Sequence, residues 1–198
     1  MKSKKTAKPS NLNGPNIITL TRIVATPPVL WLLLVDDGKM GAARWWAAGL
    51  FVLFMASDAL DGYWARSRGL VTDLGKLLDP IADKVLTGGA LVVLSMLAEL
   101  PWWVTVLVLV REIGITVHRL VAARQTVLAA AWLGKIKTAL QSVAIPLAIV
   151  PHLPFTGVWG VVLNTSLMTA AVVMTVASGI DYVLALRRNG GYGRKTGG

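Results

Sequence analysis

What the sequence lacks narrows the kind of protein that it encodes. It has no cysteine, which excludes disulfide bonds and thiolate metal sites. Only 15% of its 198 residues are charged and 55% are hydrophobic, a balance unlike that of a soluble domain of this length. Acidic residues number 10 against 20 lysines and arginines. The excess of positive charge is spread along the chain in the pattern expected of a protein at a membrane surface. We therefore expect no nucleic-acid partner.

Long apolar runs recur along the whole chain. A helix needs about 20 mainly apolar residues to span a bilayer. Six runs have about this length or more: Ile17–Val35, Ala42–Trp64, Leu74–Leu97, Trp102–Ala122, Trp132–Val150 and Phe155–Leu186. The sequence therefore predicts an all-α, polytopic membrane protein with six transmembrane helices. We expect a basic arm and interfacial segment at 1–15, the helical domain at 16–187 and a flexible tail at 188–198.

Basic and aromatic residues indicate how the helices are oriented. In a six-span topology, all lysines and arginines except Lys39 and Arg44 fall toward the side of the N-terminus. By the positive-inside rule, both termini then lie in the cytoplasm, and the protein resides in the cell's inner (plasma) membrane. Tryptophans mark the opposite interface as an aromatic belt: Trp31, Trp45, Trp46, Trp102, Trp103 and Trp159.

Five of the ten acidic residues crowd into one stretch of 26 residues, DALDGYWARSRGLVTDLGKLLDPIAD. A charge within a spanning helix costs about 3 kcal/mol, so such residues are functional by default. Asp58 and Asp61 are three apart on one helix, and Asp79 and Asp83 are four apart on the next, so each pair shares a face. Asp73 is out of this register, and we expect it to cap the second helix.

The short connection between these two helices makes them antiparallel neighbours, so the four carboxylates can converge. Left bare they would repel one another, and hard divalent cations with oxygen ligands would resolve that conflict. The plainer alternative is a set of helix-end salt bridges with Arg66, Arg68 and Lys84. It leaves unexplained why glycines, Gly62 and Gly75, are aligned with the acidic faces. We therefore favour a metal site that binds a nucleotide diphosphate.

Eight positions of this stretch match, at fixed gaps, the signature of the CDP-alcohol phosphatidyltransferase family, which the chain resembles. They are Asp58, Asp61, Gly62, Ala65, Arg66, Gly75, Asp79 and Asp83. The resemblance implies that the four aspartates hold two divalent ions, Mg²⁺ or Mn²⁺, on the diphosphate of CDP-diacylglycerol. It implies that Asp83 is the base for the incoming hydroxyl. The CMP part would contact Gly62, Ala65, Arg66 and Gly75, and the run PNIITLTRIVATPPV suggests Thr19 and Arg22 nearby.

A second group of candidate residues is basic. It consists of Arg111, Arg119, Lys135 and Lys137, around the fourth and fifth apolar runs. A buried arginine needs an anion, and a phosphorylated acceptor supplies one. The alternatives are that the lysines snorkel to lipid headgroups and that Arg111 pairs with Glu112 or Asp181. We expect this group to bind the phosphate of the acceptor.

The runs REIGITVHR and WLGKIKTALQ, with PNIITLTRIVATPPV, resemble the branch of this family whose acceptor is glycerol 3-phosphate. Branches that use phosphatidylglycerol or inositol phosphate share much of this pattern and remain alternatives. The family also implies a homodimer. A divalent-cation transporter is the alternative from another class, but transporter sites lie near the midplane between two repeats. Here the acids lie on adjacent helices at one side, and no repeat is visible.

Overall fold

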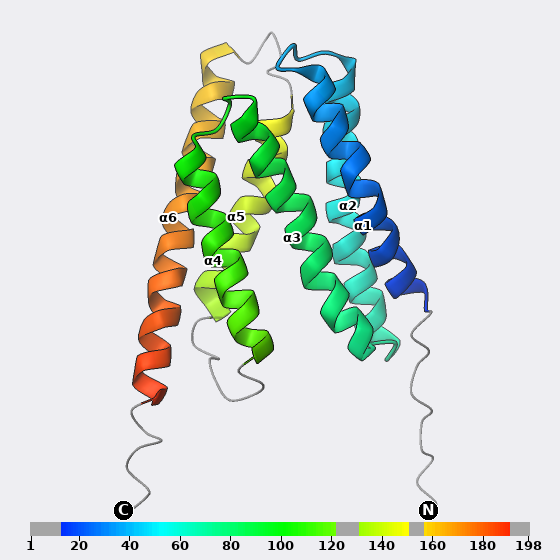
Figure 1. The fold of residues 1–198 in the computed structure, drawn as a ribbon, viewed down its shortest axis with the longest axis vertical. Coiled ribbons are helices and arrows are strands. Elements are labelled where there is room, and N and C mark those ends of the chain that lie inside the picture. Colours follow the sequence, from blue (N-terminus) through cyan, green and yellow to red (C-terminus); the bar gives the residue numbers. More distant parts are fainter. Residues whose placement is uncertain (1–12, 122–130, 151–156, 191–198) are drawn as a thin grey trace, which may run out of the picture. The chain divides into compact units, whose positions relative to one another are not determined.

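The computed structural model describes residues 13–121, 131–150 and 157–190. In these ranges the chain forms six helices and no strand (Figure 1). The helices are α1 (Gly14–Asp36), α2 (Ala42–Ser67), α3 (Asp73–Met96), α4 (Trp102–Val121), α5 (Ala131–Ile149) and α6 (Gly157–Gly190). Each corresponds to one predicted apolar run, with ends that differ by a few residues. The all-α class is thereby confirmed.

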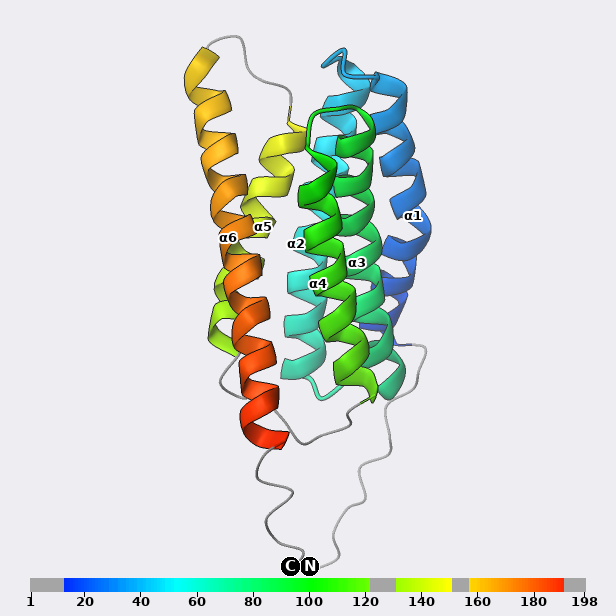
Figure 2. The same cartoon turned by 60° about the vertical axis from the view of Figure 1, so that its left-hand side comes forward.

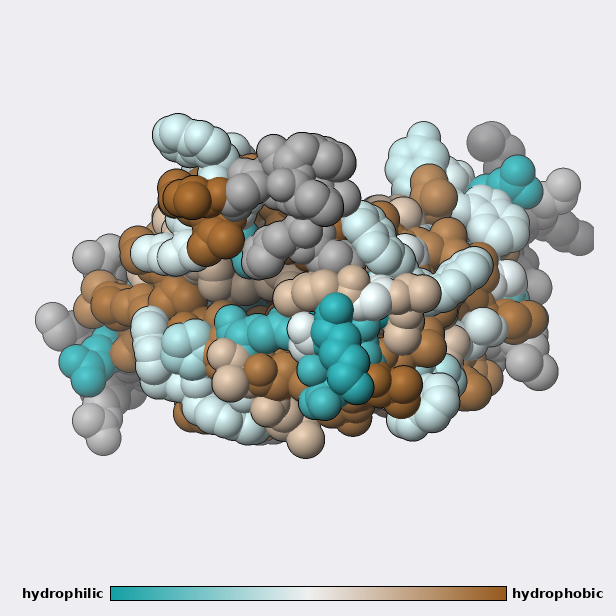
Figure 3. Space-filling view, turned by 90° about the horizontal axis from the view of Figure 1, so that it is seen from above, coloured by the Kyte–Doolittle hydropathy of each residue, from teal (hydrophilic) through white to brown (hydrophobic). Residues whose placement is uncertain are grey.

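Among the described residues, two helices are long and apolar enough to cross a membrane: Gly14–Asp36 and the part of α6 from Val158 to Arg187. Large apolar side chains are exposed on the described helices, among them Leu60, Val110 and Trp159. The end-on view in Figure 3 likewise shows hydrophobic residues over much of the described surface, with strongly hydrophilic ones in a few places. Exposed apolar surface of this extent fits contact with lipid. The chain is thus a helical protein suited to a membrane.

Contacts divide the chain into two compact units, residues 1–90 and 91–198, with the boundary inside α3. The buried residues of both units include many alanines: Ala47, Ala48, Ala82, Ala90, Ala144 and Ala171. Small buried residues let membrane helices pack closely, where the hydrophobic effect between helices is weak. The expected basic arm and the expected tail lie mostly at 1–12 and 191–198, outside the described residues.

In the first unit, local hydrogen bonds set where the helices begin. The Asn13 side chain accepts from the Asn16 backbone N–H at 3.0 Å and caps α1. Thr72 caps α3 in the same way, because its hydroxyl accepts from the Gly75 N–H at 3.0 Å. The expectation that Asp73 is the cap is therefore wrong. Asp73 is the first helical residue, and its exposed carboxylate accepts a hydrogen bond from Lys76.

Helix α1 packs along α2 and contacts α3 through a hydrogen bond from Thr19 to Asp79. Figures 1 and 2 show these three helices from two directions. At one end of α1, Asn16 Nδ2 donates to Thr72 Oγ1 at 2.7 Å. Further along, a Cβ added at Gly89 would lie 2.5 Å from Leu30 Cδ1, so this glycine permits close approach of the two helices. Side chains of three helices therefore meet where α1 begins, α2 ends and α3 begins.

In the second unit, α5 packs along α6, and α4 also contacts α6. Gln141 on α5 donates to Thr175 on α6 at 3.4 Å. The last turns of α3 are joined to α4 by the Thr105 hydroxyl, which lies 2.7 Å from Ser95 Oγ and donates to the Leu91 carbonyl. Polar contacts between apolar helices fix their register in a setting where few other directional forces act.

Candidate functional site

A cavity of about 190 Å³ lies where the first three helices meet. Six of the eight signature positions line it: Asp61, Gly62, Ala65, Arg66, Gly75 and Asp79. Helix α1 contributes Pro15, Asn16 and Thr19. The structure thus brings most of the predicted nucleotide-binding residues, Thr19 included, to one space. Asp58, Asp83 and Arg22 do not line this cavity, but Arg22 connects Asp58 to it through Asp61.

Arg22 of α1 lies between two aspartates of α2. One terminal nitrogen forms an ion pair with Asp58, and the other donates to Asp61 Oδ2 at 2.7 Å. The arginine is 2% exposed, and Asp61 is also buried. Because the two aspartates are one helical turn apart, a single guanidinium fork spans both. The predicted acidic face of α2 is therefore occupied by a cation supplied by α1.

The remaining two aspartates come from α3. Asp79 accepts a hydrogen bond from the Thr19 hydroxyl at 2.9 Å, and Asp83 forms an ion pair with Lys84 at 2.7 Å. The charges of Asp79 and Asp83 both act on the Asp58 carboxylate. The four aspartates are thus one electrostatic group. Among the described residues, however, no three acidic or histidine side chains form a cluster arranged to hold a metal ion.

Two glycines keep the cavity open. A Cβ at Gly75 would lie 2.6 Å from Asn16 Oδ1, and a Cβ at Gly62 would lie 3.3 Å from an Arg66 terminal nitrogen. A larger residue at Gly75 would therefore push the Asn16 side chain away from its bond with Thr72. Sequence reasoning missed Asn16 and Thr72 as part of this wall. The signal was available for Asn16, which lies in the same run as Thr19.

The donor chemistry of the four aspartates fits divalent metal ions. All the donors are carboxylate oxygens, the ligands that Mg²⁺ and Mn²⁺ prefer. The position of Arg22 shows that Asp58 and Asp61 together hold a cation. In the structure Arg22 takes one oxygen of each of these two aspartates, so a metal ion that used the same oxygens would have to replace the guanidinium.

The second unit contains the predicted acceptor residues, and it joins two of them to one acid. Arg111 donates to Glu112 Oε1 at 3.0 Å, and buried Lys137 of α5 forms an ion pair with the same oxygen. Arg111 also donates to Ser178 Oγ of α6 at 2.9 Å. Arg111, Glu112, Lys137 and Ser178 therefore form a polar network that joins α4, α5 and α6. The pairing of Arg111 with Glu112, which the sequence suggested as an alternative, is present in the structure.

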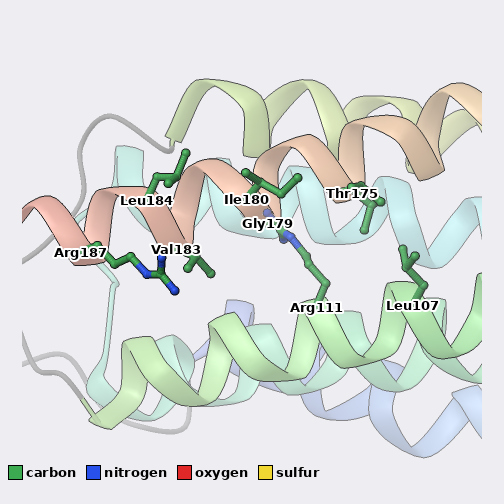
Figure 4. Close-up of a pocket in the computed structure, with 9 residues that line it drawn as sticks. Leu107, Arg111, Thr175, Gly179, Ile180, Val183, Leu184 and Arg187 are labelled. Atoms are coloured by element: carbon green, nitrogen blue, oxygen red, sulfur yellow. The ribbon is translucent and has the colours of Figure 1, made fainter.

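The other basic candidates differ in their surroundings. Lys135 is exposed, and the side chain of Arg119 lies outside the described part of the structure. Figure 4 shows Arg111 reaching from α4 toward Gly179 of α6, at the wall of a cavity of about 390 Å³. That cavity is largely apolar, and Arg187 lies near one end. Lys137 lines neither this cavity nor its neighbour beside His118.

The chain belongs to the CDP-alcohol phosphatidyltransferase family, whose model matches residues 12–179. It is 47% identical over 180 residues to a probable phosphatidylglycerophosphate synthase of Mycobacterium tuberculosis, covering 90% of this chain and 84% of that protein. It is 38% identical to the CDP-diacylglycerol–glycerol-3-phosphate 3-phosphatidyltransferase of Bacillus subtilis, covering 86% and 93%. A protein of that name from Rickettsia bellii is 30% identical, covering 89% and 96%. The resemblance seen in the aspartate signature is confirmed.

Proposed function

We propose that this chain transfers the phosphatidyl group of CDP-diacylglycerol to glycerol 3-phosphate and releases CMP. The observation that carries the proposal is the cavity at the meeting of α1, α2 and α3, which is lined by six signature positions of the family. Two relatives of the chain carry the name of this reaction. Phosphatidylglycerophosphate and CMP are the products.

The nucleotide end of the donor binds in that cavity. Gly62, Ala65 and Gly75 leave room for the CMP group, and Arg66 supplies positive charge for the phosphates. Thr19 borders the same space and holds Asp79 through its hydroxyl. Arg22 is the second arginine on the nucleotide side, one helical turn from Thr19. The acyl chains remain in lipid.

The four aspartates are the ligands for two Mg²⁺ or Mn²⁺ ions. When bound, these ions neutralise charge on the attacking, leaving and equatorial oxygens of the reacting phosphorus. The oxygen of the acceptor hydroxyl attacks the β-phosphorus. A bond forms between this oxygen and the β-phosphorus, and the bond between the β-phosphorus and the CMP oxygen breaks. Asp83 accepts the hydroxyl proton as general base. Its carboxylate is part-exposed in the structure, as a proton acceptor for an entering substrate must be.

The acceptor phosphate binds to the basic residues of the second unit. Arg111 uses two of its five N–H donors on Glu112 and Ser178, which fixes its plane and leaves three donors. Arg119 and Lys135 supply further charge on the same side of the predicted topology. Lys137 is buried against Glu112 and supports the site by neutralising that acid, so Arg111 keeps its charge for the phosphate.

The proposal includes the setting of the enzyme. The helical domain at 16–187 crosses the inner membrane six times, with both termini and the active site at the cytoplasmic face, and forms a homodimer. The two apolar helices and the exposed apolar side chains support this placement. Glycerol 3-phosphate is water-soluble and reaches the site from the cytosol.

An acceptor panel tests the proposal. Purified protein with CDP-diacylglycerol and Mn²⁺ is offered glycerol 3-phosphate, inositol phosphate, phosphatidylglycerol or serine, and CMP release is measured. We expect release with glycerol 3-phosphate and at most traces with the others. Release that depends on another acceptor of the panel would replace the proposed substrate. Metal uptake into vesicles without CMP release would favour the transporter alternative.

A further inference from the structure

Arg22 occupies the position where two proposed metal ligands meet. Its guanidinium pairs with Asp58 and Asp61 at once, and its side chain is 1% exposed. The two ion pairs use the outer nitrogens, and Nε is buried without a partner among the described residues. An arginine thus lies inside the acidic group, whereas no described cluster is arranged to hold a metal.

Arg22 takes Oδ1 of Asp58 and Oδ2 of Asp61, so a divalent ion that used these same two oxygens would have to replace the guanidinium. We propose that Arg22 is an internal counter-cation that holds Asp58 and Asp61 in the metal-free enzyme and is exchanged for the incoming ion. This inference rests on the proposed metal-dependent function. It makes Arg22 a positioning residue whose release is coupled to metal binding.

Electrostatics explains why such a residue is needed before metal arrives. Asp61 is buried, and the charges of Asp58 and Asp79 act on it. Without a counter-ion, the buried charge of Asp61 and the like charges beside it would push the helix ends apart. The Arg22 fork keeps the two ligands of α2 in place. The cost is competition, because each ion that binds has to replace contacts that the protein already makes.

The exchange also provides a use for the released arginine. Arg22 lies three residues after Thr19, so both project from one face of α1, and Thr19 borders the nucleotide cavity. A guanidinium freed from the aspartates is therefore one helical turn from the space proposed for the diphosphate. On metal binding, Arg22 would leave the carboxylates of Asp58 and Asp61 and pair with the phosphates of the donor.

A permanent salt bridge is the competing explanation, and metal affinity separates the two. Mn²⁺ binding to purified wild-type protein and to Arg22→Met is measured by calorimetry and electron paramagnetic resonance. Removal of the competitor should tighten Mn²⁺ binding by about tenfold to a hundredfold, the worth of one charge-assisted hydrogen bond. Lysine cannot bridge both acids, so Arg22→Lys should tighten binding less than Arg22→Met does.

Arg44 gives a matched control. It is a fully buried arginine of the same unit, 3.9 Å from Asp36, and no signature residue is involved in that pair. Arg44→Met should leave Mn²⁺ affinity unchanged. Equal affinities in wild type, Arg22→Lys and Arg22→Met would overturn the inference while leaving the proposed function intact. A wild type that binds no divalent ion and still transfers phosphatidyl groups would overturn the proposed metal mechanism and the inference with it.

A second measurement uses the wild-type protein, so it does not depend on whether a variant without Arg22 can fold. Wild-type protein labelled with ¹⁵N-arginine is titrated with Mg²⁺, and the Nε–H signals of Arg22 and Arg44 are followed. We expect the Arg22 signal to move with metal occupancy and the Arg44 signal to stay in place. An Arg22 signal that does not respond while Mg²⁺ binds would show that the salt bridge is permanent and would overturn the exchange.

Discussion

Two ion clusters of this chain are opposites in charge. In residues 1–90, one arginine, Arg22, is shared by the carboxylates of Asp58 and Asp61. In residues 91–198, one carboxylate, Glu112, is shared by Arg111 and Lys137. The first cluster has one surplus negative charge when all its members are ionised, and the second has one surplus positive charge.

The difference indicates which ligand each cluster attracts. A surplus charge in a poorly solvated site is not screened as it is in water, so it favours a ligand of opposite sign. The first cluster suits metal cations, and Asp79 and Asp83 add to its negative charge. The second suits the phosphate of an acceptor. The opposite charges of the two clusters match the proposed reaction, which requires one site for a metal-bound diphosphate and another for an anionic acceptor.

The largest expected effect comes from neutralising the negative cluster. Asp61→Asn should lower CMP release by at least about a thousandfold, because several kcal/mol of charge stabilisation is lost with the metal. Excess Mn²⁺ should restore little. Asp73→Asn is the matched control in the same segment, since Asp73 is exposed and forms an ion pair with Lys76, three residues further on. Near-normal turnover in Asp61→Asn would remove this residue from the metal site.

The second prediction separates the proposed base from the other ligands. Asp83→Asn should lower kcat by about 10²–10⁴-fold, the usual contribution of a general base. The KM for CDP-diacylglycerol should change only a few-fold, because three ligands remain. Steady-state kinetics over a range of CDP-diacylglycerol concentrations measures both parameters. A kcat within a few-fold of wild type would exclude Asp83 as the base.

The third prediction concerns the positive cluster and is about stability. Glu112→Leu leaves Lys137 buried without its acid and should lower the free energy of unfolding by about 3–5 kcal/mol. The double variant Glu112→Leu/Lys137→Met should recover most of that loss, since an apolar pair replaces the ion pair. Denaturant unfolding in detergent measures both. A single-variant loss below about 1 kcal/mol, as for an exposed pair, would contradict the buried-network account.

Secondary structure and the acidic cluster were predictable from the sequence because they depend on local spacing. Apolar runs gave all six helices, and the three- and four-residue spacing placed each pair of aspartates on one face. The cap of α3 was misassigned by one residue, because Thr72 and Asp73 are both good capping residues. Only the hydrogen bond from the Gly75 N–H distinguishes them.

The partners of the buried charges could not be predicted in the same way. Arg22 and Asp58 are 36 residues apart, and Lys137 and Glu112 are 25 apart, so each pairing depends on how separate helices pack. The sequence suggested Arg22 for the nucleotide side, but it did not show that Arg22 pairs with Asp58 and Asp61. It also suggested Glu112 only as one possible partner of Arg111, because nothing local shows that Lys137 shares that acid.

The smallest expected effect concerns acceptor binding by Arg119. Arg119→Ala should raise the KM for glycerol 3-phosphate by about ten- to a hundredfold, the worth of one ionic hydrogen bond, with the KM for CDP-diacylglycerol nearly unchanged. Arg68→Ala is the control, since Arg68 is an exposed arginine that lies over the Trp64 ring. A rise in the donor KM alone would move Arg119 to the nucleotide side. No change in either KM would leave it as a lipid-facing residue.

The central claim is that divalent metal at the aspartates and glycerol 3-phosphate are both required for transfer. The most direct measurement is CMP release from CDP-diacylglycerol by purified, metal-stripped protein, titrated with Mn²⁺ in the presence and absence of glycerol 3-phosphate. The account predicts that release rises with Mn²⁺ only when the acceptor is present and stops on addition of a chelator. Release that persists in chelator at the same rate would contradict it.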